Sequence, residues 1–186
     1  MIHNQKRIHF SMAYQYVREP LKSDEADRLA HACQNIKEKL AIWTLLDTGL
    51  RVSELCGLTP DNILWQQRSL RISGKGGPYG LKTKKRVVPM SKRVQALLEP
   101  YFALNDSWFA GERQIQKLVK NVANRAQITS TVTPHVLRHT FATLALQKGI
   151  SSAAVQKMLG HDRLATTEIN LNLTEGHVIE EFQNKW

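Results

Sequence analysis

The chain has 186 residues, 42% of them hydrophobic, and it carries a formal net charge of +10 at pH 7. This length accommodates one ordinary domain with a packed core, or at most two very small ones. The charge favours a polyanionic partner, nucleic acid ahead of an acidic membrane surface, with a merely basic soluble protein as the alternative.

The N-terminal half of the chain predicts an arm followed by three helices. Residues 1–20 lack clear periodicity, and we interpret them as an arm or linker. Ser23 and the two acidic residues after it begin a helix that runs to about Cys33, because a hydroxyl and early acids satisfy the free amides of a helix start. A second helix is predicted over 36–48, where a glycine stops it, and a short third one over 51–58.

Three short strands are predicted next, and only helices follow them. The strands cover about 62–65, 69–73 and 86–90, and the last two flank the run GKGGPYG. The later periodic segments predict helices at about 92–102, 114–126, 134–147, 152–159, 165–171 and from 175 onward. A mainly helical domain around a small three-stranded antiparallel sheet belongs to the α+β class.

We therefore expect the arm (1–20), one domain (21–174) and a C-terminal helical tail (175–186). The longest apolar run, LAIWTLL, is too short to span a bilayer, and no targeting peptide is visible. The two cysteines lie in apolar helical segments, which favours buried thiols over a disulfide. These features predict a cytoplasmic protein without membrane contact.

Basic residues are concentrated in the predicted hairpin. From Arg68 to Arg93 there are nine lysines or arginines and no acidic residue. Strand-like apolar residues interleave with them, so a folded basic hairpin is favoured over a solvated arm. The candidate DNA contacts in this hairpin are Arg71, Lys82, Lys84, Lys85 and Arg86.

Two basic residues are unusual for their predicted positions. Arg51 begins a helix, where a cation opposes the helix dipole, so it indicates a bound anion or an ion pair with Glu54 or Glu25. Lys75 lies in GKGG, where glycines permit close approach to a ligand, although a solvated loop lysine is the alternative.

Histidines and a second arginine occur near predicted helix ends. His135 and Arg138 share one helix face near its N-terminus, where anions are favoured, although His135 can also be a cap or a core histidine. His139 is expected in the core, and His161 follows a glycine turn. No metal-ligand spacing is present. Two arginines, a lysine and histidines suit phosphoryl chemistry, because they clamp oxygens, protonate a leaving alkoxide and move a proton.

Four ordered blocks, TGLRVSELCGLTPDNI, GKG, HVLRHTFAT and LGHDRLATTEI, resemble the tyrosine recombinase (phage integrase) family from about Pro20 to the C-terminus. The resemblance implies the catalytic-domain fold of that family, double-stranded DNA as partner, no cofactor or metal, and self-association in a tetrameric synapse. It places Arg51, Lys75, His135, Arg138 and His161 on the catalytic positions, with Glu54 as the supporting acid.

The resemblance fails at the nucleophile. Relatives carry a tyrosine nine residues after the last histidine, and this chain has Asn170 there. In the family that tyrosine attacks a DNA phosphodiester to give a 3′-phosphotyrosyl bond and a free 5′-hydroxyl. A phenol can be activated for this attack, whereas a carboxamide cannot form the linkage. One base change converts a Tyr codon into an Asn codon, so natural and deliberate replacement both stay open.

Two further departures concern the ends and the hairpin. Full relatives carry an additional N-terminal helical domain, so the chain is expected to be an excised domain or a minimal form. The hairpin is longer than the short form common in relatives, and we favour Lys75 over the later lysines because it lies in the GKG motif. The apolar residues of the tail pack on their own core or dock on a neighbouring subunit, as in the family.

Three functions remain. The first is a site-specific recombinase catalytic domain that is defective in cleavage because of Asn170. The second is a catalytically silent DNA-binding or regulatory module derived from a recombinase. A helix-turn-helix repressor ranks third, because the helical spacing in LALQKGISSAAVQKMLGH permits it but leaves the phosphate-binding residues unexplained.

Overall fold

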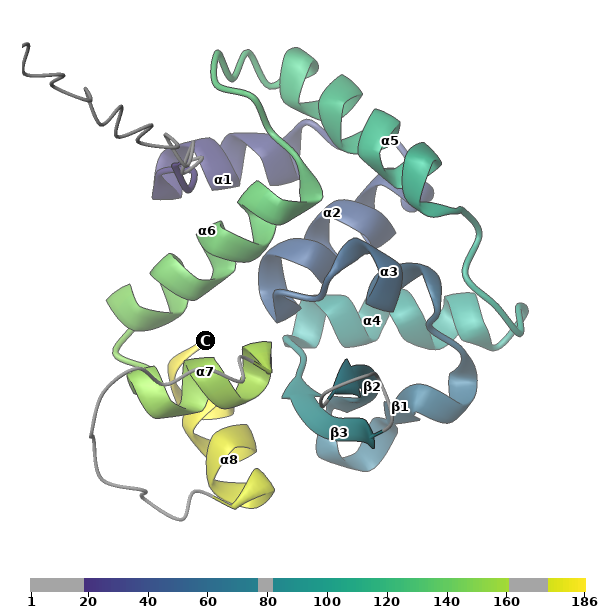
Figure 1. Cartoon of the computed structure of the whole chain (residues 1–186). Helices are drawn as coiled ribbons and strands as arrows, with labels where there is room; N and C mark the ends of the chain where they lie inside the picture. Colours follow the sequence, from purple (N-terminus) through teal and green to yellow (C-terminus); the bar gives the residue numbers. More distant parts are fainter. Residues whose placement is uncertain (1–18, 77–81, 161–173) are drawn as a thin grey trace, which may run out of the picture.

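The computed structural model describes residues 19–76, 82–160 and 174–186, and for residues 74–76 and 82–84 only the backbone. Figure 1 shows helices around a small sheet at one end of the domain. The helices are α1 (Ser23–His31), α2 (Ile36–Thr48), α3 (Val52–Cys56), α4 (Lys92–Phe102), α5 (Glu112–Arg125), α6 (Pro134–Gln147), α7 (Ser152–Leu159) and α8 (Glu175–Lys185). The strands are β1 (Ile63–Leu64), β2 (Ser69–Gly76) and β3 (Lys82–Pro89), with 3₁₀ turns at Pro60–Asn62 and Trp65–Gln67. The α+β prediction is confirmed.

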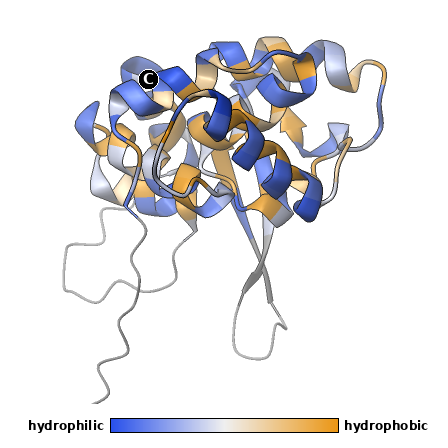
Figure 2. Cartoon of the chain, turned by 90° about the horizontal axis from the view of Figure 1, so that it is seen from above, coloured by the Kyte–Doolittle hydropathy of each residue, from blue (hydrophilic) through white to orange (hydrophobic). Residues whose placement is uncertain are grey.

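Helix α2 is the centre of the core. It contacts α1, α4, α5 and α6, and its side chains Leu40, Ile42 and Leu45 are fully buried. Burial of each such side chain stabilises the fold by roughly 2 kcal/mol. Figure 2 shows the apolar residues gathered between the elements and the polar ones on their outer faces. The core therefore holds α2 and the turn after it in a fixed place.

The turn after α2 brings the chain to the site. Gly49 ends α2 in the left-handed region at φ 62°, as the sequence predicts. A Cβ at Gly49 would collide with the ring of Phe141 on α6, so this position needs glycine for space as well as for conformation. The tight turn lets Arg51 begin α3 directly beside α6.

The hairpin is longer than predicted. The sheet order is β1-β2-β3, all antiparallel, and Ser69 opposite Pro89 and Gly76 opposite Lys82 mark the ends of the β2 and β3 pairing. The GKG run therefore lies in the ladder and not in a loop. The hydrogen bonds between strands join backbone groups, so the pairing continues through glycines. Strand propensity depends on side chains and therefore does not predict this extension. Figure 2 shows β2 and β3 projecting from the helical body.

The C-terminal tail forms the predicted helix and packs on its own chain. Helix α8 contacts α7 and β3, and it buries Val178 and Phe182 in a second core cluster with Phe141. The Trp186 ring stacks on Phe182, with centroids 5.3 Å apart and planes 14° from parallel. The tail thus packs on its own core, and its docking on a neighbouring subunit stays a prediction.

Both cysteines are free thiols. Cys33 is buried, and burial, with a smaller effect of nearby Glu38, raises its pKa to about 11. Cys56 is half-buried, so the prediction of two buried thiols holds for one. Within the described ranges, no helix is long and apolar enough to cross a membrane.

Candidate functional site

Arg51 occupies the N-cap position of α3 and is tied to that helix by Glu54. The backbone N–H of Arg51 donates to Oε2 of Glu54 at 2.8 Å, and its Nη1 donates to Oε1 at 2.9 Å. The Arg51 side chain remains 46% exposed. The ion pair expected as one alternative is therefore present, and it leaves much of the guanidinium accessible.

Glu54 receives a second arginine from the sheet. Arg86 of β3 donates from Nη1 to Oε1 at 2.9 Å and from Nη2 to Oε2 at 2.8 Å, while its Nε donates to the Met158 carbonyl at 2.7 Å. The side chain of Glu54 is 7% exposed and that of Arg86 is 9% exposed. Burial raises the pKa of Glu54, but the hydrogen bonds from Arg86 and Arg51 outweigh it and hold that pKa below its ordinary value.

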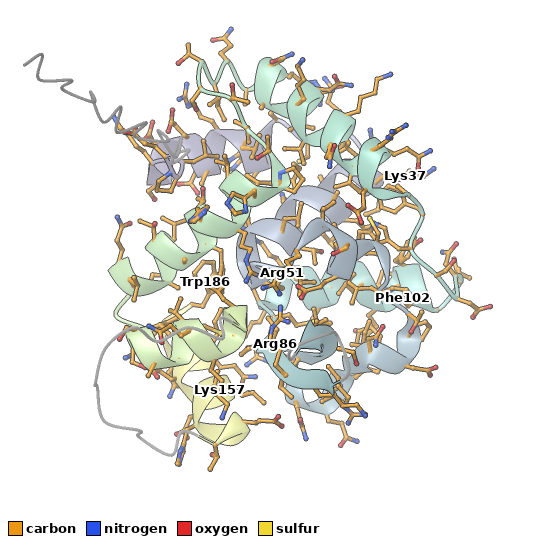
Figure 3. All side chains as sticks on the ribbon, viewed as in Figure 1. Lys37, Arg51, Arg86, Phe102, Lys157 and Trp186 are labelled. Atoms are coloured by element: carbon orange, nitrogen blue, oxygen red, sulfur yellow. The ribbon has the colours of Figure 1, made fainter. Side chains whose placement is uncertain are left out.

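The position of Arg86 corrects its prediction as a DNA contact. Its guanidinium is turned into the domain and satisfied there by a carboxylate and a helix-end carbonyl. Figure 3 shows Arg86 and Arg51 close together at the centre of the domain. Arg86, Val88 and Met90 are all buried, so the alternation of β3 turns Arg86 toward the interior.

Arg138 of α6 is the third arginine at this point. It is 6% exposed, and it donates from Nη1 to the Gly49 carbonyl and from Nη2 to the Leu159 carbonyl, both at 2.6 Å. It therefore fixes the turn before Arg51 and the end of α7. Burial, and then repulsion from Arg51, lowers the pKa of Arg138 to about 10.

We call Arg51, Arg86 and Arg138 with Glu54 the arginine cluster. Their charges act on one another, because Arg51 and Arg86 both lower the pKa of Arg138 while Glu54 raises it. Three arginines and one glutamate give the cluster a net charge of +2. A partly buried excess of positive charge is suited to binding an anion.

His135 lies in the first turn of α6, and its side chain is exposed. Thr133 caps this helix by accepting from the Val136 N–H at 3.3 Å. His139, one turn later, is also exposed, which corrects its prediction as a core residue. The buried face of α6 carries Leu137, Arg138 and Phe141 instead, so periodicity assigned His139 to the wrong side.

The remaining predicted site residues lie either in the hairpin or outside the described residues. The Lys75 backbone pairs with Thr83 in the hairpin, and Lys82 and Lys84 pair with Gly76 and Gly74. Arg71 and Lys85 have exposed side chains, and their assignment as DNA contacts stays a prediction. His161, Asn170 and the predicted helix 165–171 lie outside the described residues, as does the arm up to residue 18.

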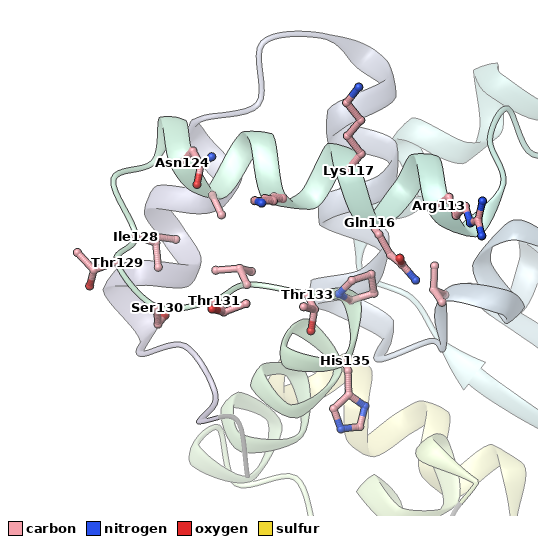
Figure 4. A pocket seen from close by; sticks show the side chains of 15 residues that line it. Arg113, Gln116, Lys117, Asn124, Ile128, Thr129, Ser130, Thr131, Thr133 and His135 are labelled. Atoms are coloured by element: carbon pink, nitrogen blue, oxygen red, sulfur yellow. The ribbon is translucent and has the colours of Figure 1, made fainter. Parts of the chain in front are cut away.

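A cavity of about 800 Å³ lies beside His135 and was not predicted. It is lined by α5, the loop 127–133 and the start of α6, as Figure 4 shows. Its charged lining residues are Arg113, Lys117 and Lys120, all exposed. Their spacing of four and three residues along a predicted helix is the sequence signal that could have revealed this basic face.

Comparison with known proteins gives a consistent result. Residues 19–177 match the model of the phage integrase family. The tyrosine recombinase XerA of Pyrococcus horikoshii is 33% identical over 178 residues, which cover 88% of this chain and 60% of that protein. The chain thus spans about three fifths of this relative's length.

Two solved structures share the fold. The crystal structure of a XerA recombinase superposes with a TM-score of 0.67 and 31% identity, covering 83% of this chain and 62% of the other. The Tn1549 transposon integrase, solved in complex with circular intermediate DNA, superposes with a TM-score of 0.63 at 22% identity, covering 83% of this chain and 62% of that one.

Proposed function

The chain belongs to the phage integrase family of tyrosine recombinases, and we propose that it is the catalytic domain of a site-specific DNA recombinase whose strand cleavage is silenced by Asn170. The observation that carries the proposal is that Arg138 binds the Gly49 carbonyl, two residues before Arg51, so that the two arginines are close enough to repel each other. Two guanidinium groups with complementary positions are what the non-bridging oxygens of a phosphodiester require.

Arg138 is held in a way that keeps donors for a ligand. Each Nη donates one N–H to a carbonyl, and toward the residues that the structure describes the guanidinium keeps a second N–H on each Nη and one on Nε. With a pKa of about 10, Arg138 stays protonated at neutral pH. A bound phosphodiester would relieve its repulsion from Arg51, so anion binding is coupled to the charge of this residue.

Arg86 contributes to the site by binding both carboxylate oxygens of Glu54. Because its two Nη groups bind both carboxylate oxygens, Arg51 is attached to Glu54 through a single side-chain hydrogen bond. The other guanidinium donors of Arg51 can then reach a second phosphate oxygen. We therefore assign Arg86 to positioning within the cluster, in place of its earlier assignment to the DNA surface.

The remaining steps follow from the family resemblance. A tyrosine oxygen attacks the phosphorus, the bond from phosphorus to the 5′-oxygen breaks, and Lys75 gives a proton to the leaving 5′-oxygen. His135 and His161 hold the phosphoryl group and accept the proton of the attacking hydroxyl. Return of a 5′-hydroxyl from a partner strand reverses the step. No metal or nucleotide is needed in this scheme.

Asn170 interrupts the scheme at its first step. Its amide cannot replace a phenol as the attacking group, so we propose that the chain binds DNA and does not cut it. A catalytically silent DNA-binding or regulatory module is the alternative. Restoring Asn170→Tyr separates the two, because a chain that differs from an active recombinase by one residue should regain cleavage.

Double-stranded DNA is the proposed substrate. Arg113, Lys117 and Lys120 line the cavity next to His135, and basic side chains of this kind suit contact with a phosphate backbone. The Tn1549 integrase, which shares the fold, was solved with DNA. We further propose that four copies assemble on paired DNA sites, in the cytoplasm where the DNA lies. A helix-turn-helix repressor does not account for the arginine cluster.

Salt-dependent binding tests the DNA proposal. Affinity for a duplex should fall steeply with salt, and Lys117→Ala should weaken binding and reduce the slope of log K against log salt by about 0.9. Lys148→Ala is the matched control, because Lys148 caps the far end of α6 beside Trp186. Equal slopes for the two variants would place the DNA elsewhere on the domain.

A further inference from the structure

Two histidines on α6 form a direct contact. The Nε2 atoms of His135 and His139 are 2.9 Å apart, within hydrogen-bond distance. The ring centroids are 4.4 Å apart and the planes are 85° from parallel. In this edge-to-face arrangement the ring nitrogens of the two imidazoles meet. The family resemblance assigns no catalytic role to His139, and the sequence analysis expected it in the core.

The helix holds this contact in register. Residues four apart lie one above the other on a helix face, so the two imidazoles are neighbours on the exposed face of α6. The Thr133 cap and Pro134 in the first turn fix the backbone on which His135 stands. The buried side of α6 is anchored by Arg138 and Phe141, so the helix presents the histidine pair in a fixed direction.

A hydrogen bond between two imidazole nitrogens constrains both rings. One Nε2 must carry a proton and the other must offer a lone pair, so the tautomers of His135 and His139 are linked. Turning the His135 ring by half a turn about its χ2 axis would replace Nε2 with a carbon and break the bond. The contact therefore selects one orientation of the His135 ring and links its tautomer to that of His139.

We infer that His139 is a positioning residue for His135: it fixes the ring orientation with which His135 meets a phosphodiester, and it links the tautomers of the two rings. The inference rests on the proposed function for the role of His135, but the hydrogen bond itself is independent of that role.

The chemistry of the partner supports this assignment. Catalytic histidines are often oriented by a carboxylate, which adds a negative charge. Beside a site that binds a phosphodiester, a carboxylate would repel the phosphate and offset part of the net +2 charge of the arginine cluster. A neutral imidazole orients the ring without that repulsion. The pair is exposed, so its value lies in orientation and little in stability.

Nitrogen NMR of the histidine rings tests the inference in the chain as it is. At pH 8, where an ordinary imidazole is neutral, the ¹⁵N shifts of the pair should show one protonated and one unprotonated Nε2. In His139→Phe, the ring shifts of His135 should move toward the average of two exchanging tautomers. In His139→Gln, whose amide can donate or accept, the parent pattern should largely return. His177→Gln on α8 is the control and should leave His135 unchanged.

Each outcome decides the inference. A His135 spectrum that is the same in His139→Phe and in the parent would overturn it, as would equal loss of the pattern in the Gln and Phe variants. Amide spectra of the same samples show that the variants are folded. Strand cleavage after Asn170→Tyr tests the proposed function separately. If the tautomers are linked but Asn170→Tyr does not cleave DNA, the histidine pair is supported and the recombinase assignment is contradicted.

Discussion

Arg86 and Glu54 form a bidentate ion pair in the interior, with both Nη to Oε distances under 3 Å (2.9 Å and 2.8 Å). The pair joins β3 to α3 across 32 residues of sequence. The Arg86 Nε reaches the Met158 carbonyl at the end of α7, so one side chain connects three elements. Glu54 also binds Arg51, so the same hydrogen bonds that stabilise the domain position this site residue.

Glu54→Gln should destabilise the domain by about 3 kcal/mol, because removing one partner leaves a buried charge uncompensated. Urea unfolding measures this free energy. Glu180→Gln, an exposed residue on α8, should change the same quantity by less than about 0.5 kcal/mol. Equal, small effects of the two substitutions would show that the interior pair does not form in solution.

The same carboxylate predicts an acid-sensitive stability. The pKa of Glu54 lies below its ordinary value of 4.5 in the folded chain, so its contribution is fully present above pH 4.5 and is lost as pH falls through the folded pKa. The difference in unfolding free energy between the parent and Glu54→Gln should therefore be constant from pH 7 to 5 and shrink below 4.5. A difference that grows on acidification would contradict the sign of the shift.

Gly160 should be more sensitive to substitution than Gly149. Both have positive φ, 67° and 81°, so alanine costs roughly 1 kcal/mol of backbone strain at either position. At Gly160 a Cβ would also lie 2.9 Å from Cδ of Arg86, whereas nothing lies within 4 Å at Gly149. Gly160→Ala should cost at least about 1 kcal/mol more in thermal or urea unfolding. Equal costs would mean that Arg86 does not pack against the end of α7.

Phe182 tests whether α8 packs on its own chain in solution. Its side chain is 1% exposed, so Phe182→Ala should cost about 3 kcal/mol, whereas the exposed Asn184→Ala should have little effect. The melting temperature of the parent should not depend on protein concentration, because the helix is covered within one chain. A melting temperature that rises with concentration would instead indicate that α8 docks on a second copy.

Local signals explain why most helices were predictable. The caps of α2, α6 and α7 are Asn35, Thr133 and Ser151, and each side chain accepts a backbone N–H three residues later, as the sequence rules require. The extension of β2 and β3 was not predictable in this way. It depends on pairing between segments that the glycine-rich run separates, and no single segment carries that information.

Most residues of the site could be predicted from the sequence, but the contacts between them could not. Arg51, Glu54 and Arg138 came from motif spacing and the family resemblance. The buried role of Arg86 depends on partners 32 and 72 residues away, and a basic residue in a basic hairpin gave no local sign of it. His139 was misplaced for the opposite reason, because a helix of apolar residues offers no local clue to which histidine faces out.

The most direct test of the central claim is covalent adduct formation with DNA. A duplex bound by this chain is first selected from a random-sequence library, and nicked versions of it are incubated with the parent and with Asn170→Tyr. Denaturing gels then detect protein linked to DNA. The Arg138→Ala form of Asn170→Tyr serves as the control without the phosphate clamp.

We predict an adduct with Asn170→Tyr, none with the parent, and a loss of at least about a hundredfold in rate when Arg138 is removed as well. This result would mean that the arginine cluster is intact and that Asn170 alone silences a recombinase. No adduct with Asn170→Tyr, on DNA that it demonstrably binds, would contradict the account and favour a silent DNA-binding module.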